Sequence, residues 1–288
     1  MDSNVVRRVG FAVVAIPVAL AIVYLGGIPL ALLVAVASLL GTRELYDLAA
    51  QKGVRALRGP GLVAATSIAP LTYAALTDPR VADFLNAWWP FVLITGAVVL
   101  LLWLLATRGP TDQPLAAIGV TLFGIGYSGA MPAFLLVIRH GGGSLDPRAA
   151  TALVFFPLVA TWVCDTAAMF GGRAMQGPKM APTISPGKTW SGAVSGVIGA
   201  LIVVPVWQVV ALGPAGVALP WTVALLIAGA AGVLGQLGDL AESLFKREAG
   251  VKDSSAIIPG HGGVLDRLDS LYVVLPVTAL LYRAFGII

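Results

Sequence analysis

Long apolar runs, separated by short polar segments, occupy most of this sequence. About nine of these runs approach the length of roughly 20 residues that a helix needs to cross the hydrocarbon core of a bilayer. They lie near residues 9–26, 28–41, 60–77, 86–106, 115–138, 149–170, 190–212, 220–244 and 264–285. The sequence therefore predicts an all-α, polytopic integral membrane protein with about nine transmembrane helices.

The composition excludes a water-soluble protein. Hydrophobic residues make up 58% of the chain and charged residues 11%, whereas soluble domains carry about 25% charged residues. So few charges cannot cover a surface exposed to water, and no polar segment is long enough for a soluble domain. The single cysteine, Cys164, rules out an intramolecular disulfide, and we interpret it as a packed apolar residue. With a net charge of only +4, we expect no nucleic-acid partner.

The lysines and arginines indicate how the chain is oriented. The N-terminal segment resembles a signal peptide, but no small-residue cleavage site follows and a second apolar run begins at Ile28, so we expect a retained first span. Of the 18 lysines and arginines, only Arg80, Arg139, Arg148 and Arg283 fall on the side opposite the N-terminus. Cytoplasmic loops carry the excess of these residues. We therefore predict a multi-pass protein of the cytoplasmic (inner) membrane, with its N-terminus in the cytoplasm and its C-terminus outside.

Ionisable side chains within the apolar runs are concentrated late in the chain. Asp165 ends the sixth run, Asp239 and Glu242 lie near the end of the eighth, and Asp266 and Asp269 begin the ninth. Residues three apart share a helix face, and charges at membrane depth are usually functional. By the predicted topology all of them lie toward the cytoplasmic side. Oxygen ligands with little histidine or cysteine favour a hard cation such as Mg²⁺, Mn²⁺ or Ca²⁺.

Two basic, glycine-rich segments accompany these carboxylates. Residues 171–189 begin with Gly-Gly-Arg and end with Ser-Pro-Gly-Lys-Thr, and residues 245–263 contain three basic residues and end with Pro-Gly-His-Gly-Gly. Glycine lets the backbone approach an anion closely, and lysine and arginine neutralise its charge. A metal beside such segments predicts the binding of nucleotide phosphates. The simpler interpretations are that the basic residues anchor helix ends at the membrane interface, and that Glu242 and Lys246 form a surface ion pair.

The tripeptide Gly187-Lys188-Thr189 matches only the end of an NTPase phosphate-binding loop. The full pattern needs a glycine at the position of Pro182 and a preceding strand, which the sequence does not predict. We therefore exclude an NTPase P-loop.

The segment from Ser243 to Asp269 resembles the signature of the phosphatidate cytidylyltransferases, also called CDP-diacylglycerol synthases. It reads SLFKREAGVKDSSAIIPGHGGVLDRLD, and each fixed position of the signature matches. Weaker matches to the same family lie at Cys164-Asp165-Thr166 through Gly171, at Ser185–Trp190 and at Glu44–Leu48. The resemblance covers nearly the whole chain and is strongest from about residue 160 onward.

The resemblance implies an activity and a set of site residues. The family makes CDP-diacylglycerol and pyrophosphate from CTP and phosphatidic acid with Mg²⁺, and the resemblance implies the same activity here. It also implies a helical homodimer with a polar cavity open to lipid. Asp239 and Asp266 match the positions that hold the metal, beside which some members bind K⁺. We expect catalytic roles for Lys188, Lys246, Arg247, Lys252, Asp253, His261 and Arg267, and substrate binding by Asp165, Arg173, Ser185, Thr189, Ser243, Gly262 and Gly263. In this hypothesis the basic residues hold phosphates, Asp253 orients a lysine, and His261 contacts a phosphate or the ribose.

The chain divides into two regions by chemical content. Residues 1–145 carry few chemical clues and are interpreted as a scaffold, a dimer contact or a lipid entrance, whereas residues 146–288 form the catalytic region. Three other functions stay open. These are a related CTP-dependent membrane enzyme acting on another lipid acceptor, an ion or phosphate transporter, and a structural membrane protein.

Overall fold

The computed structural model describes residues 17–143, 145–258, 260 and 262–288, and most of its regular structure is helical. Residues 17–25 form a first helical segment. The helices that follow are α2 (Gly27–Ala50), α3 (Arg58–Thr77), α4 (Pro79–Thr107), α5 (Pro114–Gly124), α6 (Met131–His140), α7 (Pro147–Met175), α8 (Trp190–Trp207), α9 (Trp221–Ala249) and α10 (Leu265–Ala284). A 3-10 turn at Pro110–Asp112 and π-helical segments at Ile125–Ala130 and Gln208–Leu212 join or extend them.

Seven helical segments among the described residues are long and apolar enough to cross a membrane. They correspond to the second through eighth predicted runs, with α5, the π-helical segment and α6 forming one of them. The first run, near 9–26, is described only from residue 17, where residues 17–25 are helical. The ninth forms α10, which carries Asp266, Arg267 and Asp269 near its start and is not one of the seven. The all-α, polytopic architecture agrees with the prediction, whereas the count of nine spans stays a prediction.

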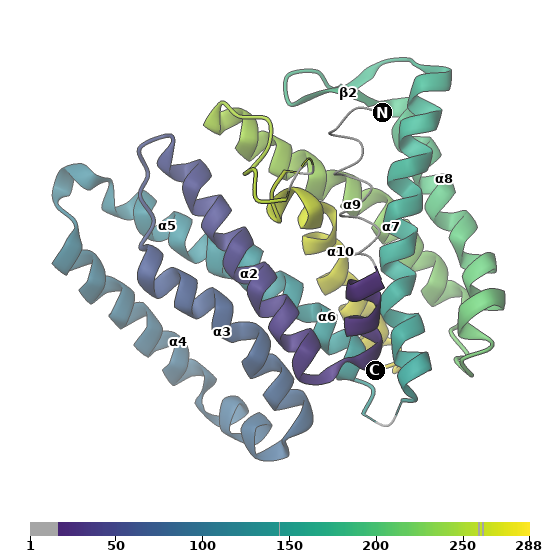
Figure 1. Cartoon of the computed structure of the whole chain (residues 1–288), viewed down its shortest axis with the longest axis horizontal. Coiled ribbons are helices and arrows are strands. Elements are labelled where there is room, and N and C mark those ends of the chain that lie inside the picture. Colours follow the sequence, from purple (N-terminus) through teal and green to yellow (C-terminus); the bar gives the residue numbers. More distant parts are fainter. Residues whose placement is uncertain (1–16, 144, 259, 261) are drawn as a thin grey trace.

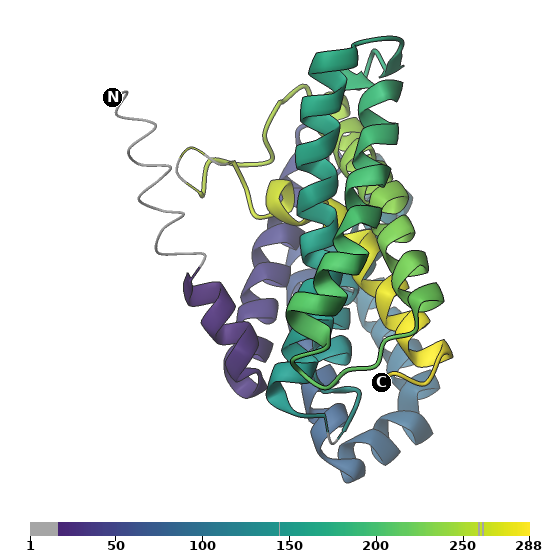
Figure 2. The ribbon, with the colours of Figure 1, turned by 90° about the vertical axis from the view of Figure 1, so that its right-hand side faces the viewer.

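The helices form two groups with α10 between them. Figure 1 shows α2, α3, α4 and α5 on one side and α7, α8 and α9 on the other, and Figure 2 shows the long helices running roughly side by side. α10 packs against α9, α6 and α2 and so joins the two groups. The β-hairpin and the 250–264 loop lie at one end of the bundle, and the C-terminus lies toward the other end (Figure 1). This arrangement brings the segments with chemical motifs together.

Tyr46 shows how small residues allow the helices of the first group to pack. Its side chain is fully buried, and its hydroxyl donates a hydrogen bond of 2.9 Å to the Thr121 carbonyl oxygen. A Cβ atom at Gly61 or at Gly124 would overlap the tyrosine side chain. Glycines at such contacts let backbones approach closely, as is common between membrane helices.

We expect Tyr46→Phe to lower the free energy of unfolding by about 1 kcal/mol, because it removes one buried hydrogen bond and leaves the ring in place. Thermal unfolding in detergent measures the change. Tyr24→Phe is the matched control because the Tyr24 side chain is exposed. An equal shift for both variants would contradict a specific role for the Tyr46 hydroxyl.

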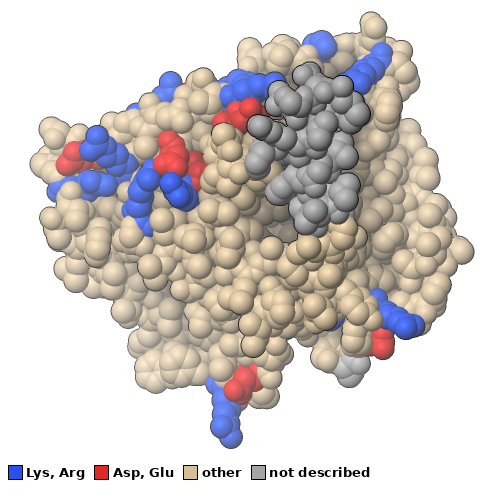
Figure 3. All heavy atoms as spheres, viewed as in Figure 1, with Lys and Arg blue, Asp and Glu red and all other residues tan. Residues whose placement is uncertain are grey.

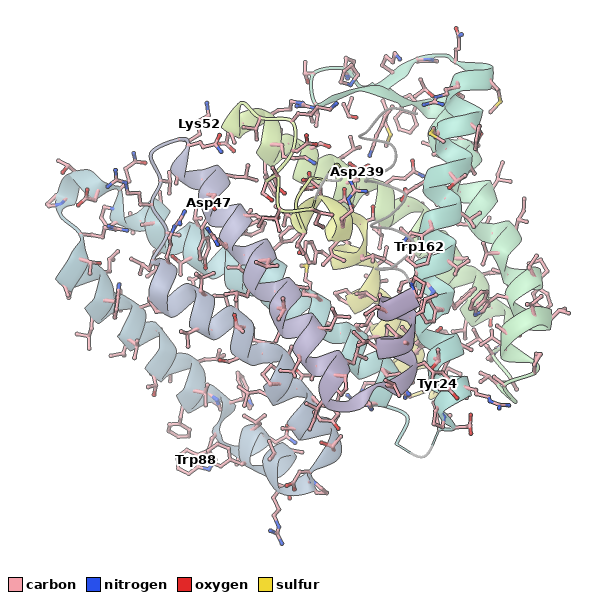
Figure 4. All side chains as sticks on the ribbon, in the orientation of Figure 1. Tyr24, Asp47, Lys52, Trp88, Trp162 and Asp239 are labelled. Carbon is pink, nitrogen blue, oxygen red and sulfur yellow. The ribbon has the colours of Figure 1, made fainter. Side chains whose placement is uncertain are left out.

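The outer surface is apolar over most of its height, as a membrane protein requires. On α4 only Leu100 is buried, and its exposed residues include Trp88, Trp89, Phe91 and Trp103. Figure 3 shows Lys, Arg, Asp and Glu gathered toward the two ends of the molecule with a broad uncharged band between them, and Trp88 projects from α4 in Figure 4. Lipid is the environment that suits such a surface.

One element departs from the purely helical prediction. Strands β1 (Lys179–Ala181) and β2 (Ser185–Thr189) form a short antiparallel hairpin between α7 and α8. The expectation that no strand precedes residue 182 is therefore wrong, because β1 ends immediately before it. The exclusion of an NTPase P-loop still holds, since Pro182 occupies the required glycine position and the strand leads into a hairpin rather than into a helix.

Candidate active site

An open cavity of about 1140 Å³ lies among α7, the hairpin, α9, the 250–264 loop and α10. Most of the predicted site residues line it: Asp165, Arg173, Lys188, Thr189, Asp239, Ser243, Lys246, Arg247, Lys252, Asp253, Asp266 and Arg267. Ser185, Gly262 and Gly263 do not line it, and His261 lies outside the described residues. The cavity thus gathers residues that are up to about a hundred positions apart in the chain, and Figure 4 locates Asp239 on α9 within this region.

One face of α9 forms one wall of the cavity. Asp239, Ser243 and Lys246 are separated by four and three residues, so they share one face of the helix. The Ser243 hydroxyl donates to Asp239 Oδ1 at 3.2 Å. The opposite carboxylate oxygen, Oδ2, is 2.8 Å from Lys188 Nζ on β2. This ion pair joins the hairpin to α9 across the cavity.

Lys246 lies between two carboxylates in the wall of the cavity. Its Nζ atom is 2.7 Å from Asp266 Oδ1 and 3.1 Å from Glu242 Oε2. The exposed fraction is 8% for Lys246 and 0% for Glu242. The interpretation of Glu242 and Lys246 as a surface pair is therefore wrong, because α10 covers this face of α9 and brings Asp266 against it. The two carboxylates and one ammonium form a buried charge cluster that we call the Lys246 triad.

Asp266 also organises the 250–264 loop. Its Oδ2 atom accepts hydrogen bonds from the Ser254 amide at 2.9 Å, the Ser254 hydroxyl at 2.8 Å and the Gly263 amide at 2.8 Å. A Cβ atom at Gly263 would overlap the Ser254 hydroxyl and the Glu44 carboxylate, which explains the glycine there. Gly263 is thus part of the loop packing beneath the cavity rather than of its lining.

Other predicted residues also make structural contacts. Arg247 donates from Nε to the Ile184 carbonyl at 3.1 Å and from Nη1 to the Val251 carbonyl at 2.9 Å, which ties the hairpin to the end of α9. The Thr189 hydroxyl accepts from the Gly192 amide at 3.1 Å and caps α8. Lys252, Asp253 and Arg267 line the cavity on the loop and α10.

The cavity carries groups of both signs that suit a metal–nucleotide complex. Asp165, Asp239 and Asp269 line it together with several lysines and arginines. Within the described parts of the chain, no three metal-ligating side chains are grouped closely enough to hold an ion by themselves. Mg²⁺ normally uses one or two carboxylates and completes its shell with water and substrate phosphates. The donor set therefore fits Mg²⁺ bound together with a nucleotide better than a closed protein metal site.

Sequence reasoning gave no site role to two carboxylates that the structure brings to this region. Asp269 was recognised among the membrane carboxylates but not assigned, and it lines the cavity next to Asp239. Glu44 on α2 reaches the 250–264 loop from the other helix group and is 1% exposed. The sequence feature that could have indicated a role for Glu44 is a carboxylate just after an apolar run, within the weaker family match at Glu44–Leu48.

The comparisons with known proteins agree with this site. Residues 6–285 match the model of the cytidylyltransferase family. The phosphatidate cytidylyltransferase of Brucella suis is 38% identical over 214 residues, which cover 69% of this chain and 73% of that protein. The phosphatidate cytidylyltransferase of Bacillus subtilis is 32% identical over 284 residues, which cover 97% of this chain and 98% of that protein. This chain therefore belongs to the cytidylyltransferase family.

Proposed function

We propose that this protein transfers CMP from CTP to phosphatidic acid, giving CDP-diacylglycerol and pyrophosphate. The observation that carries the proposal is the cavity itself, in which the signature residues of α9, the 250–264 loop and α10 face a lysine of the hairpin at one end of an apolar helix bundle. The relatives in Brucella suis and Bacillus subtilis are phosphatidate cytidylyltransferases, which supports the same reaction here.

The chemistry needs positioning and charge neutralisation more than a strong base. A phosphate monoester has a second pKa of about 6, so phosphatidic acid already carries a nucleophilic anion near neutrality. One of its oxygens attacks the α-phosphorus of CTP, the bond to the bridging oxygen of the β-phosphate breaks, and pyrophosphate leaves with that oxygen. Arg173, Lys252 and Arg267 line the cavity where these polyanions would meet. Holding both substrates against their mutual repulsion is the main task of the site.

The carboxylates are proposed to bind Mg²⁺ together with the triphosphate. A carboxylate oxygen has two acceptor positions, and Asp239 Oδ1, Asp239 Oδ2 and Asp266 Oδ1 each interact with one donor among the described residues. Asp239 and Asp266 are therefore the residues proposed to hold the ion, and Asp269 lies beside them. The ion would supply charge stabilisation for the departing pyrophosphate. A neighbouring K⁺, which the family resemblance implies, stays a prediction.

The same geometry suits one soluble and one membrane substrate. The cavity is open, and the bundle that carries it presents an apolar surface to lipid. We propose that CTP enters from the cytoplasm and phosphatidic acid from the bilayer, in a protein of the cytoplasmic membrane that acts as a homodimer. The assignment of cytoplasmic orientation rests on the distribution of lysine and arginine. The roles of His261 and Asp253 stay predictions.

A reconstituted assay tests the reaction directly. Purified protein is incubated with labelled CTP, Mg²⁺ and vesicles containing dioleoyl phosphatidic acid, and the lipid phase is analysed by mass. We expect Mg²⁺-dependent formation of CDP-diacylglycerol with release of pyrophosphate, and no product when EDTA is in excess. A phosphorylated lipid with CDP as the second product would instead indicate a kinase that uses CTP. No lipid product from folded protein, whatever the acceptor, would favour transport.

A further inference from the structure

Glu44 is a buried carboxylate with an unusual set of partners. It lies on α2, in the helix group that carries few chemical motifs, and it is 1% exposed. Burial of a charged carboxylate is costly unless hydrogen bonds compensate for the lost water. No lysine or arginine forms an ion pair with Glu44 in the part of the chain that the structure describes. Its charge is instead balanced by hydrogen bonds from one segment more than two hundred residues away.

Four donors of the 254–265 segment converge on this one side chain. Oε1 accepts from the Ser255 hydroxyl at 2.7 Å and from the Val264 amide at 3.1 Å. Oε2 accepts from the Leu265 amide at 2.8 Å and shares the single Ser254 hydroxyl proton, whose oxygen is 3.0 Å away, with Asp266 Oδ2. Each oxygen thus joins one residue at the start of the segment to one residue at its end. Glu44 fastens the two ends of this part of the loop to each other and to α2.

A simple cap for α10 does not account for this arrangement. A carboxylate near a helix N-terminus is stabilised by the free amides of the first turn, and Val264 and Leu265 supply those. The hydroxyls of Ser254 and Ser255 come from the far side of the loop and are not needed for a cap. Their presence indicates that the position of the loop, and not only the end of the helix, is fixed by Glu44.

The fixed segment holds cavity residues on both sides. Lys252 and Asp253 directly precede Ser254, and Asp266 and Arg267 directly follow Leu265. On the opposite side of the loop, Asp266 accepts from the same Ser254 hydroxyl and from the Gly263 amide. The loop is therefore clamped between two carboxylates, one that lines the cavity and one that comes from α2.

We propose that Glu44 is a positioning residue for the proposed reaction, which holds the 254–265 segment so that Lys252 and Arg267 meet the substrate phosphates. This inference rests on the proposed function, and it gives the first helix group a role in catalysis without direct contact with substrate. A displacement of about 1 Å at a catalytic group can reduce the rate about 100-fold. Loss of the Glu44 contacts should therefore affect the folded enzyme and not only the amount of folded protein.

The test compares Glu44→Gln, Ser255→Ala and Asp47→Asn with the full-length wild type. Glutamine keeps the size of the side chain but replaces one accepting oxygen by an NH₂ group that faces donors. Ser255→Ala removes one of the four donors, and because Ser255 lies in the loop, the change alters no packing between helices. Asp47→Asn is the control, because Asp47 lies one turn further along α2 with an exposed carboxylate that pairs with Arg58. Monodisperse protein of each variant is assayed for kcat and KM with Mg–CTP and phosphatidic acid, and hydrogen exchange of residues 251–265 is measured without substrate.

We expect kcat/KM to fall about 100-fold for Glu44→Gln and about 3- to 10-fold for Ser255→Ala. Exchange in the loop should be faster in both variants, with unchanged exchange in α7 and α8, and Asp47→Asn should match the wild type. The inference would be overturned by two results together. Ser255→Ala would show the wild-type kcat/KM and the wild-type hydrogen exchange in the loop, and folded Glu44→Gln would show the wild-type kcat/KM. If Glu44→Gln does not fold, Ser255→Ala decides alone by the same two measurements. Absence of product from the wild type counts against the proposed function only, because the exchange comparison uses no substrate.

Discussion

Asp239→Asn should reduce the formation of CDP-diacylglycerol about 1000-fold or more while leaving the protein folded. Asparagine keeps the shape of the side chain and its acceptor for the Lys188 ammonium, which lies 2.8 Å from Asp239 Oδ2. It removes the negative charge, and we propose that this charge holds Mg²⁺ against the triphosphate. Removing one group that stabilises transition-state charge costs about 100- to 1000-fold in rate, and weakened metal binding adds to that loss. Turnover with a Mg²⁺ titration, on protein checked by thermal unfolding, measures the effect.

Comparing Asp266→Asn with Asp239→Asn separates the proposed metal role from the role of Asp266 in holding the loop. Asp266 also accepts three hydrogen bonds from Ser254 and Gly263 and pairs with Lys246. We therefore expect it to lose activity and also to unfold at a lower temperature, whereas Asp239→Asn should unfold close to the wild type. Asp47→Asn, an exposed carboxylate on α2, is the control for both. Near-normal turnover in either site variant would remove that residue from the proposed metal site.

The membrane architecture and most of the residues that line the cavity could be predicted from the sequence. Apolar length alone predicts spanning helices, because each helix satisfies its own backbone hydrogen bonds in lipid. The signature from Ser243 to Asp269 is a continuous segment, so its match does not depend on the fold. Helix spacing predicted one shared face for Asp266 and Asp269, and both line the cavity. The same spacing paired Asp239 with Glu242, of which Asp239 lines the cavity and Glu242 is fully buried.

Contacts between segments that are far apart in the chain could not be predicted from the sequence. Nothing in the α9 sequence indicates that α10 covers Glu242 and Lys246, so a spacing of four residues was compatible with a surface pair. Glu44 stands more than two hundred residues before the serines that it binds, and its local sequence contains no sign of them. The hairpin was missed because both strands are short and β2 contains Pro186 and Gly187, which are poor strand formers.

Lys246→Met should produce the largest loss of stability among the changes considered. Methionine fills a similar volume, but it leaves Glu242 and Asp266 facing each other without a cation. Glu242 is fully buried, and the cation that it pairs with among the described residues is Lys246, whose Nζ lies 3.1 Å from Oε2. Removing one member of a buried ion pair costs about 3–5 kcal/mol. Thermal unfolding in detergent should show this loss, and Lys52→Met, which changes an exposed lysine at the same end of the bundle, should not.

The double variant Lys246→Met with Glu242→Gln distinguishes a structural lysine from a catalytic one. Neutralising Glu242 removes the unpaired buried charge, so the double variant should recover part of the stability that the single variant loses. Activity should stay low, because Asp266 still lacks the ammonium that holds its Oδ1 and the cavity lacks one positive charge. Full recovery of both stability and turnover would mean that Lys246 serves only to balance Glu242. Recovery of stability without turnover would place the Lys246 triad in the phosphate-binding machinery, with Glu242 serving to orient the lysine toward Asp266.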